Sequence, residues 1–171
     1  MSFEKISYEQ VTKINSDKLM RDWMLITAGN TGGVNTMLAS WGGIGVLWGG
    51  PVAFIFVRES RYTKKFIDEN ECFSLTFFTE DYKQGLSLCG TVSGRDNDKI
   101  KNAGLTVVNA DSVPYFSQAS IVFNCRKLSA TLIDTSDLLD KSIIERFYGD
   151  NDRHIMYVGK IEEILVNNDN L

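Results

Sequence analysis

The sequence is poor in the residues that hold metal ions and cross-link small folds. Three cysteines and one histidine occur in 171 residues, and Cys72, Cys89 and Cys125 lie far apart. An odd number of widely spaced cysteines predicts neither a disulfide framework nor a zinc site. The single histidine, His154, cannot form a metal cluster. We therefore expect no metal, a reducing compartment and, by default, a cytoplasmic location.

Long apolar runs and a surplus of basic residues are also missing. No window approaches the roughly 18 consecutive apolar residues of a membrane-spanning helix. The first twenty residues carry charges throughout and have no apolar centre, unlike a signal peptide. The net charge of −4 argues against general binding to nucleic acid or anionic membranes, because both need an extended basic face. We expect neither as a partner.

Proline, repeats and low-complexity segments are scarce as well. Only two prolines occur, and nothing in the sequence marks a linker. A chain of this length with 43% hydrophobic residues has the size of one ordinary domain and can bury a core without cross-links. We expect one domain over residues 1–171.

Hydrophobic patterning predicts a β-rich chain with short helices. Alternation over residues 72–79 predicts a strand with one buried face. Strands joined by short helices, without regular βαβ alternation, favour an antiparallel barrel with added helices over a doubly wound sheet. Strands are expected at 23–28, 35–43, 51–57, 72–79, 105–108, 120–132 and 154–166, and helices at 60–70 (capped by Ser60 or Thr63), 80–88, 93–103 (capped by Ser93 or Asp96 and ended by Gly104) and 138–147.

Glycine is concentrated in one place, since eight of the fourteen glycines lie between Gly29 and Gly50. Such density is tolerated where the chain turns through positive φ or where another group approaches the backbone closely. The same stretch holds a polar cluster that ends in Trp41. The pattern indicates a flat ligand against bare backbone, with Trp41 as an aromatic wall and Trp48 in the core.

Two small basic groups stand out in this acidic chain. One follows the predicted strand 51–57 and holds Arg58, Arg61, Lys64 and Lys65; the other surrounds residues 95–101. Both lie at predicted helix starts, where free backbone N–H groups favour a compact anion such as phosphate. Solvated helix faces and surface turns explain the same residues. Neither loop matches GxxxxGK[ST] or GxGxxG, so nucleotide hydrolysis and a Rossmann site have no support.

Four segments together resemble the flavin reductase-like family, in particular its flavoredoxin-type members. They are Asn35–Gly45, Arg58–Thr63, Cys89–Lys99 and His154–Ile161, and they follow one another in the family's order. The resemblance covers the chain from about Trp23 to Val166. One position departs from the pattern, because relatives commonly carry threonine where this chain has Leu38.

The resemblance implies an FMN-binding split β-barrel, antiparallel and Greek-key-like, that forms a homodimer. It implies ring and ribityl contacts from the 35–41 segment, phosphate contacts from the 58–63 turn and the 93–99 segment, a position for Cys89 near the ring edge, and one for His154 near the flavin or the incoming reductant. The implied cofactor-binding set is Asn35, Thr36, Ala39, Ser40, Trp41, Arg58, Ser60, Arg61, Tyr62, Thr63, Cys89, Ser93, Gly94, Lys99 and His154.

Three functions remain open at this point. The first is an NAD(P)H-dependent flavin reductase, in which the flavin performs the chemistry and His154 is the candidate catalytic side chain. The second is an electron carrier that holds FMN and receives electrons from a protein partner. The third is a redox-inactive binding module, for which His154 and the basic residues are structural.

Overall fold

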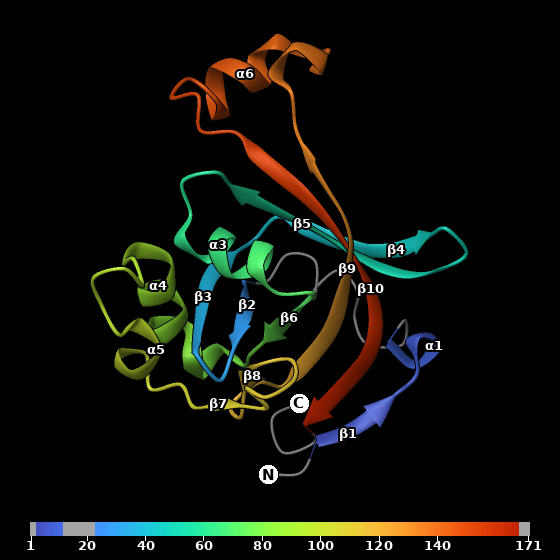
Figure 1. Cartoon of the computed structure of the whole chain (residues 1–171), viewed down its shortest axis with the longest axis vertical. Coiled ribbons are helices and arrows are strands. Elements are labelled where there is room, and N and C mark those ends of the chain that lie inside the picture. Colours follow the sequence, from blue (N-terminus) through green and yellow to red (C-terminus); the bar gives the residue numbers. More distant parts are fainter. Residues whose placement is uncertain (1–2, 12–22, 168–171) are drawn as a thin grey trace.

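The computed structural model describes residues 3–11 and 23–167, and Figure 1 shows a twisted antiparallel sheet with short helices around it. A small separate ladder joins β7 (Val107–Val108) to β8 (Tyr115–Phe116). The predicted class, mainly β with added helices, is confirmed. The main sheet of the described residues contains β1 (Phe3–Ile6), β2 (Met24–Asn30), β3 (Gly33–Ala39), β4 (Gly42–Leu47), β5 (Gly50–Arg58), β6 (Cys72–Phe77), β9 (Ile121–Leu132) and β10 (His154–Asn167).

The helices begin and end at different residues from those that the sequence predicted. Arg61, rather than Ser60 or Thr63, occupies the N-cap position of α3, and the Asp98 carboxylate, rather than Ser93 or Asp96, caps α5. Gly104 has a φ of 70°, as expected of a helix terminator. The helical elements are α1 (Tyr8–Val11), α3 (Tyr62–Glu69), η1 (Glu80–Tyr82), α4 (Lys83–Thr91), α5 (Lys99–Asn102), η2 (Thr135–Asp137) and α6 (Lys141–Phe147).

The sheet curls into a barrel that stays open along one seam. Its strands run in the order β3-β2-β6-β9-β10-β5-β4, with β1 added to β10. The edge strands β3 and β4 are consecutive in the chain, and Ser40 and Trp41 connect them. Among the described strands no ladder joins β3 to β4. The predicted split barrel is confirmed, although the strand predicted over 35–43 ends at Ala39 and the glycine-rich β4 was missed.

Strand β6 is buried on both of its faces. Phe73, Leu75 and Phe77 of β6 pack inside the barrel. Ser74 and Thr76 are buried too, and their hydroxyls donate to backbone carbonyls. The prediction of one buried face for this strand was wrong, because a second apolar cluster, built around α4 and β8, covers the outer face of the sheet. That cluster contains Leu25, Leu86, Cys89, Leu105 and Phe116.

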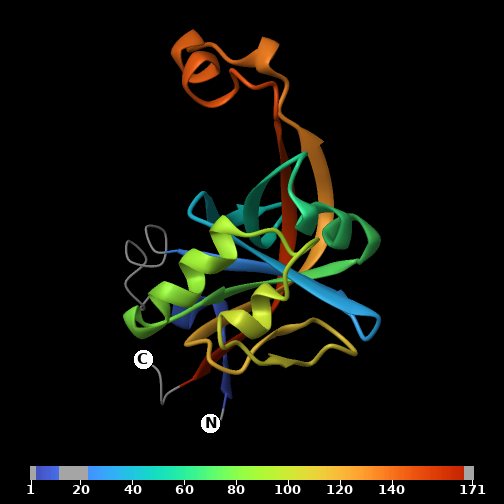
Figure 2. The same ribbon diagram turned by 90° about the vertical axis from the view of Figure 1, so that its left-hand side faces the viewer.

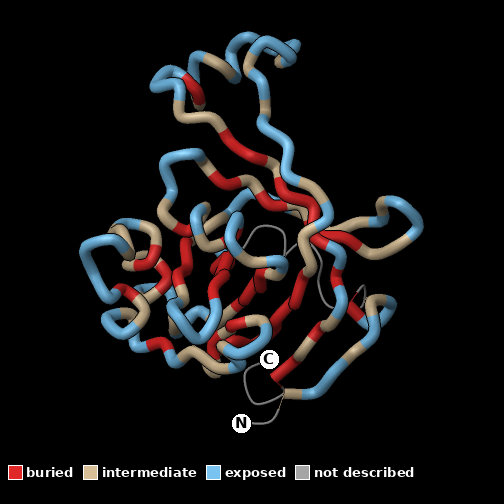
Figure 3. Tube along the Cα trace, viewed as in Figure 1, coloured by how far each residue is buried: buried red, intermediate tan, exposed pale blue. Residues whose placement is uncertain are grey.

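One part of the molecule projects from the barrel. Beyond Lys127, β9 pairs only with β10, and the two strands carry η2 and α6 away from the body, as Figures 1 and 2 show. We call residues 128–153 the arm. Figure 3 shows that the arm is mostly exposed while the barrel strands are buried. Leu139 in the arm is 98% exposed. No helix of the described residues is long and apolar enough to cross a membrane.

Candidate functional site

Two cavities follow each other along β3. The polar cavity, of about 410 Å³, begins at the first half of the strand, and the aromatic cavity, of about 300 Å³, begins at its second half. The polar cavity is lined by Val34, Asn35, Gly94, Arg95, Asp96, Asn97, Asp98, Lys99 and Ile100. The aromatic cavity is lined by Met37, Leu38, Ala39, Ser40, Trp41, Phe56, Arg58, Arg61, Phe147 and His154.

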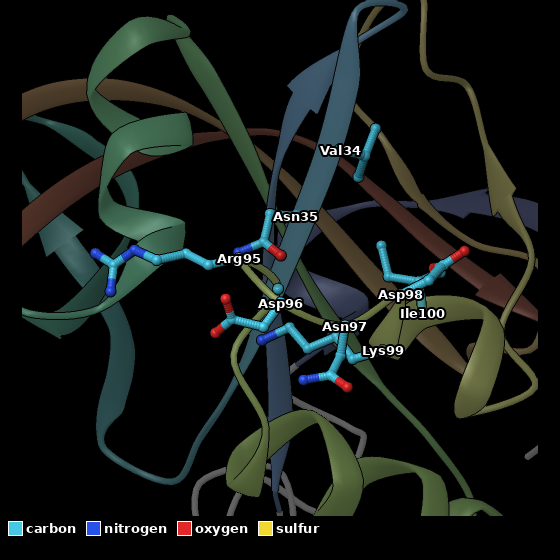
Figure 4. Close-up of a pocket in the computed structure, with 9 residues that line it drawn as sticks. Val34, Asn35, Arg95, Asp96, Asn97, Asp98, Lys99 and Ile100 are labelled. Carbon is cyan, nitrogen blue, oxygen red and sulfur yellow. The ribbon is translucent and has the colours of Figure 1, made fainter.

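Lys99 is the central charge of the polar cavity (Figure 4). Its side chain is buried, and Nζ donates to the carbonyl oxygens of Cys89 at 3.3 Å and Val92 at 3.4 Å. Among the described residues no carboxylate forms an ion pair with it. Burial lowers the pKa of the Lys99 ammonium, and the nearby charge of Arg61 lowers it further. A buried cation whose hydrogen-bond partners are neutral carbonyls attracts negative charge.

Asn35 holds the first turn of α3 and the loop before α5 against β3. Its Nδ2 donates to Thr63 Oγ1 at 2.9 Å, and both side chains are buried. A Cβ at Gly94 would lie 2.1 Å from Asn35 Oδ1, so no larger residue fits there. Arg95 then reaches across to α3, with its guanidinium carbon 5.2 Å from the centre of the Tyr62 ring. The two basic groups of the sequence therefore lie side by side.

In the turn that precedes α3, Arg58 and Ser60 bind the arm, whereas the Arg61 side chain, within the described residues, makes no hydrogen bond to it and lines the aromatic cavity. Arg58 donates to the carbonyl oxygens of Asp152 at 2.7 Å and Phe147 at 2.8 Å. Ser60 donates both its backbone N–H and its hydroxyl to the Asp152 carboxylate. The structure therefore commits Arg58 and Ser60 to the arm rather than to a phosphate. Arg61 is exposed, lines the aromatic cavity and makes no side-chain hydrogen bond within the described residues.

The wall of the aromatic cavity is built from the β3–β4 connection and the arm. The Trp41 ring lies 5.2 Å from Phe147 in an edge-to-face arrangement and 5.3 Å from His154, centroid to centroid. Trp41 is 45% exposed. Ala39 and Ser40 line the same cavity. Small and polar residues on one side and aromatic rings on the other suit a flat aromatic ligand.

His154 is a buried, neutral member of this wall. Its Nδ1 shares a hydrogen bond of 3.1 Å with the Tyr148 hydroxyl. Burial lowers the pKa of the imidazole, and the positive charge of Arg58 lowers it further. The neutral ring therefore keeps Nε2 as its remaining hydrogen-bonding atom. Among the described residues no group of three or more His, Cys, Asp or Glu side chains could hold a metal ion.

Four side chains of the predicted set lie outside both cavities in a way that argues against a ligand contact. The Thr36 hydroxyl is fully buried and bonds to Thr27 and the Ile26 carbonyl. Cys89 packs in the second apolar cluster, where burial raises the pKa of its thiol. The Ser93 hydroxyl accepts from the backbone of its own loop, and the Ser60 hydroxyl donates to Asp152.

Trp48, which the sequence predicted to lie in the core, is 68% exposed at the β4–β5 turn.

Sequence reasoning missed the arm as a contributor to the site. Phe147 and Asp152 received no role, although the run Gly149–Asp152 is typical of a turn. Their importance depends on the pairing of His154 with Arg58, which brings residues nearly a hundred positions apart together. A local pattern carries no signal for such a pairing.

The geometry places a charged cavity with a buried lysine beside an aromatic cavity at the seam of a split antiparallel barrel. A model of the flavin reductase like domain matches residues 17–171 of this chain. The chain belongs to the flavin reductase-like family. No curated protein matches the chain in a sequence search.

Solved structures share the fold over nearly the whole chain. An FMN-binding domain of a flavin reductases-like enzyme from Shewanella baltica aligns with a TM-score of 0.71 and 14% identity, covering 96% of this chain and 77% of that one. A flavoredoxin from Methanosarcina acetivorans gives 0.67 and 21%, covering 96% and 76%. Nitrilotriacetate monooxygenase component B from Bacillus cereus gives 0.68 and 17%, covering 96% and 79%. At these identities the likeness establishes the fold.

Proposed function

We propose that the chain binds FMN, with the phosphate in the polar cavity and the ring in the aromatic cavity. The buried Lys99 ammonium carries this proposal, because it has only carbonyl partners and lies near Arg61. Such a pair of cations repels itself unless an anion is present. Asp96 and Asp98 line the same cavity, but both are exposed, and water and salt screen their repulsion of an anion.

The shapes of the cavities fit the two ends of this cofactor. The close contact of Gly94 with Asn35 brings a backbone loop against β3 without a side chain between them. Farther along the strand, Trp41 and the small residues Ala39 and Ser40 form a slot for a planar ring. Arg61 lines the aromatic cavity, its charge acts on Lys99, and within the described residues its guanidinium makes no hydrogen bond that would compete with a phosphate.

We further propose that the protein is an NAD(P)H-dependent flavin reductase. When bound, FMN supplies hydride and electron transfer at its ring. The chain's residues bind and orient: Lys99 and Arg61 attract the phosphate, and Trp41 limits access to one side of the slot. Neutral His154 offers a hydrogen bond at the wall, held in place by Tyr148.

The absorption spectrum of the purified protein, before and after anaerobic addition of NADH or NADPH, tests this function. Flavin bands that bleach within seconds support the reductase. Bands that persist leave FMN binding intact and exclude the nicotinamides as reductants. A protein that shows no flavin bands, even after FMN is added and unbound flavin is removed, contradicts the whole proposal and returns the chain to a redox-inactive binding module.

One observation favours an electron carrier as the second candidate. Phe147 of the arm and His154 of β10 both lie against Trp41 in the lining of the aromatic cavity, and they occupy room that a nicotinamide stacked on the flavin would need. A carrier needs only an exposed flavin edge and a docking surface for a redox protein. Rapid reduction by a reduced ferredoxin-type protein, together with no reduction by NADH or NADPH, would favour the carrier.

We also propose a homodimer in a reducing, cytoplasmic compartment. The arm exposes Leu132, Leu139 and Ile143, apolar side chains that a second copy could cover. All three cysteines are free thiols. Light scattering at micromolar concentration tests the dimer, and a mass of one chain contradicts it.

A further inference from the structure

The loop at the base of the arm is tied to the body by a compact set of polar contacts. Arg58 holds this loop through the carbonyls of Phe147 and Asp152, and its guanidinium also lies 3.4 Å from the Asp150 carboxylate. The Asp152 carboxylate, which belongs to this loop, accepts hydrogen bonds from the Ser60 hydroxyl at 2.6 Å and from the Ser60 backbone N–H at 3.0 Å. Charge-assisted hydrogen bonds of this kind are the stronger ones in proteins.

Within this set Arg58 and Asp152 are more shielded than the neighbouring surface pair, whereas Ser60 and Asp150 are exposed. The side chains of Arg58 and Asp152 are 22% and 21% exposed, whereas Arg153 and Glu59, an ion pair on the same turn, are 37% and 41% exposed. Because exposed pairs contribute little, we expect the side-chain contacts of Arg58 and Asp152 to hold the loop more firmly than the Glu59–Arg153 pair does. Glu59 and Arg153 thus provide a matched control within three residues.

The tied turn also borders the polar cavity, where the phosphate is proposed to bind. The Ser60 carbonyl accepts from Arg95, and the Thr63 hydroxyl accepts from Asn35, and both donors line that cavity. On the other side of the tie, Phe147 and His154 flank the Asp152 loop and form the cavity wall with Trp41. A movement of the turn therefore changes the wall through Asp152.

We propose that Arg58, Ser60 and Asp152 form a latch that fixes the arm against the phosphate-facing turn, so that phosphate binding positions Phe147 and His154 at the aromatic cavity. The latch residues are positioning residues and need no contact with the ligand. This inference rests on the proposed FMN site and adds regulation to it, since cofactors with and without phosphate would leave the arm in different states.

Hydrogen exchange of the full-length protein without flavin tests the first half of the proposal. In Asp152→Ala and Ser60→Ala, we expect amides of α6 to exchange at least tenfold faster than in the wild type, while amides of β6 and β9 keep their rates. Glu59→Gln should leave α6 unchanged. Equal α6 exchange in Asp152→Ala and the wild type would overturn the latch, and faster exchange throughout the barrel would show a general structural role instead.

Comparison of FMN with riboflavin, which lacks the phosphate, tests the second half. In the wild type, saturating FMN should slow α6 exchange several-fold more than saturating riboflavin, and this difference should vanish in Asp152→Ala although FMN still binds. Equal protection by both flavins in the wild type would overturn the coupling. If neither flavin binds, the proposed function and the coupling fail together, while the exchange measured without flavin still decides whether the latch fixes the arm.

Discussion

The body and the arm of this molecule are stabilised by different means. In the body, strands such as β6 are buried on both faces, and apolar burial supplies the stability. In the arm, Leu139 is almost fully exposed, and the segment depends on the contacts of Arg58 and Asp152 and on two edge-to-face pairs of aromatic rings, Trp41 with Phe147 and His154 with Tyr148. The aromatic cavity therefore combines walls from the well-packed body with a wall, at Phe147, from the less well-packed arm.

The largest expected contrast is in folding stability. Phe123→Ala, in the fully buried core of the body, should lower the free energy of unfolding by about 3–5 kcal/mol, because it leaves a cavity. The matched truncation in the arm, Leu139→Ala, should change it by less than about 0.5 kcal/mol. Urea unfolding of both variants measures the contrast. Similar losses would mean that the arm folds as part of the core.

The second contrast compares the binding of FMN with that of riboflavin, and so separates the polar cavity, where the phosphate is proposed to bind, from the aromatic cavity. Lys99→Met should weaken FMN binding by about 1.5–3 kcal/mol, since a charge-assisted contact is lost. Riboflavin binding should not change, because riboflavin has no phosphate. The control is Lys101→Met, two residues away on α5 and exposed. Fluorescence titration gives all these constants, and equal effects on FMN and riboflavin would remove the phosphate from the polar cavity.

A smaller effect measures the aromatic contact between body and arm. A double-mutant cycle with Trp41→Ala and Phe147→Ala should give a coupling energy of about 0.5–1.5 kcal/mol, as edge-to-face pairs do. The cycle is read from thermal or urea unfolding at neutral pH. The same cycle with Arg146→Ala in place of Phe147→Ala should give no coupling, and a coupling there would point to a general loss of arm structure.

The smallest effect is a dependence of stability on pH. Because the pKa of His154 is lower in the folded protein, the unfolded chain binds a proton first as the pH falls below about 6.5. Stability should therefore be complete above that value and decline between pH 6.5 and 5.5. His154 is the only histidine, so His154→Gln should flatten this part of the curve. Melting temperatures at pH 7.5 and 5.5 provide the test, and an unchanged slope would assign the dependence to carboxylates.

The sequence located elements in both the body and the arm, where α6 lies within the helix predicted over 138–147, but not the contacts between the two parts. Strands β5, β6, β9 and β10 and the helix α3 lie close to their predicted positions, because apolar runs and alternation are local signals. β4 was missed, since its glycines hide the alternation. β1 and α1 were also missed, and each is only four residues long.

For the site, the sequence indicated which residues line the cavities, but it did not indicate which hydrogen-bond partners those residues have within the protein. The fold gathers Asn35, Gly94 and Lys99 at one cavity and Ser40, Trp41 and His154 at the next, and their joining into one ligand site stays a prediction. Arg58 and Ser60 have the chemistry of phosphate ligands, and only the fold shows that Asp152 has already engaged them. The pairing of β5 with β10 brings the Asp152 carboxylate next to Ser60, and this contact between distant segments cannot be predicted from a local sequence pattern.

Two glycines of this chain would look alike in a mutational library and have opposite tolerances. Gly104 has a positive φ and open space around its Cα, so asparagine, which accepts that conformation, should be admitted there. Gly94 has an ordinary φ but no room at all beside Asn35, so even alanine should be rejected. Directed evolution of this scaffold would therefore have to vary positions 35 and 94 together, or leave both fixed.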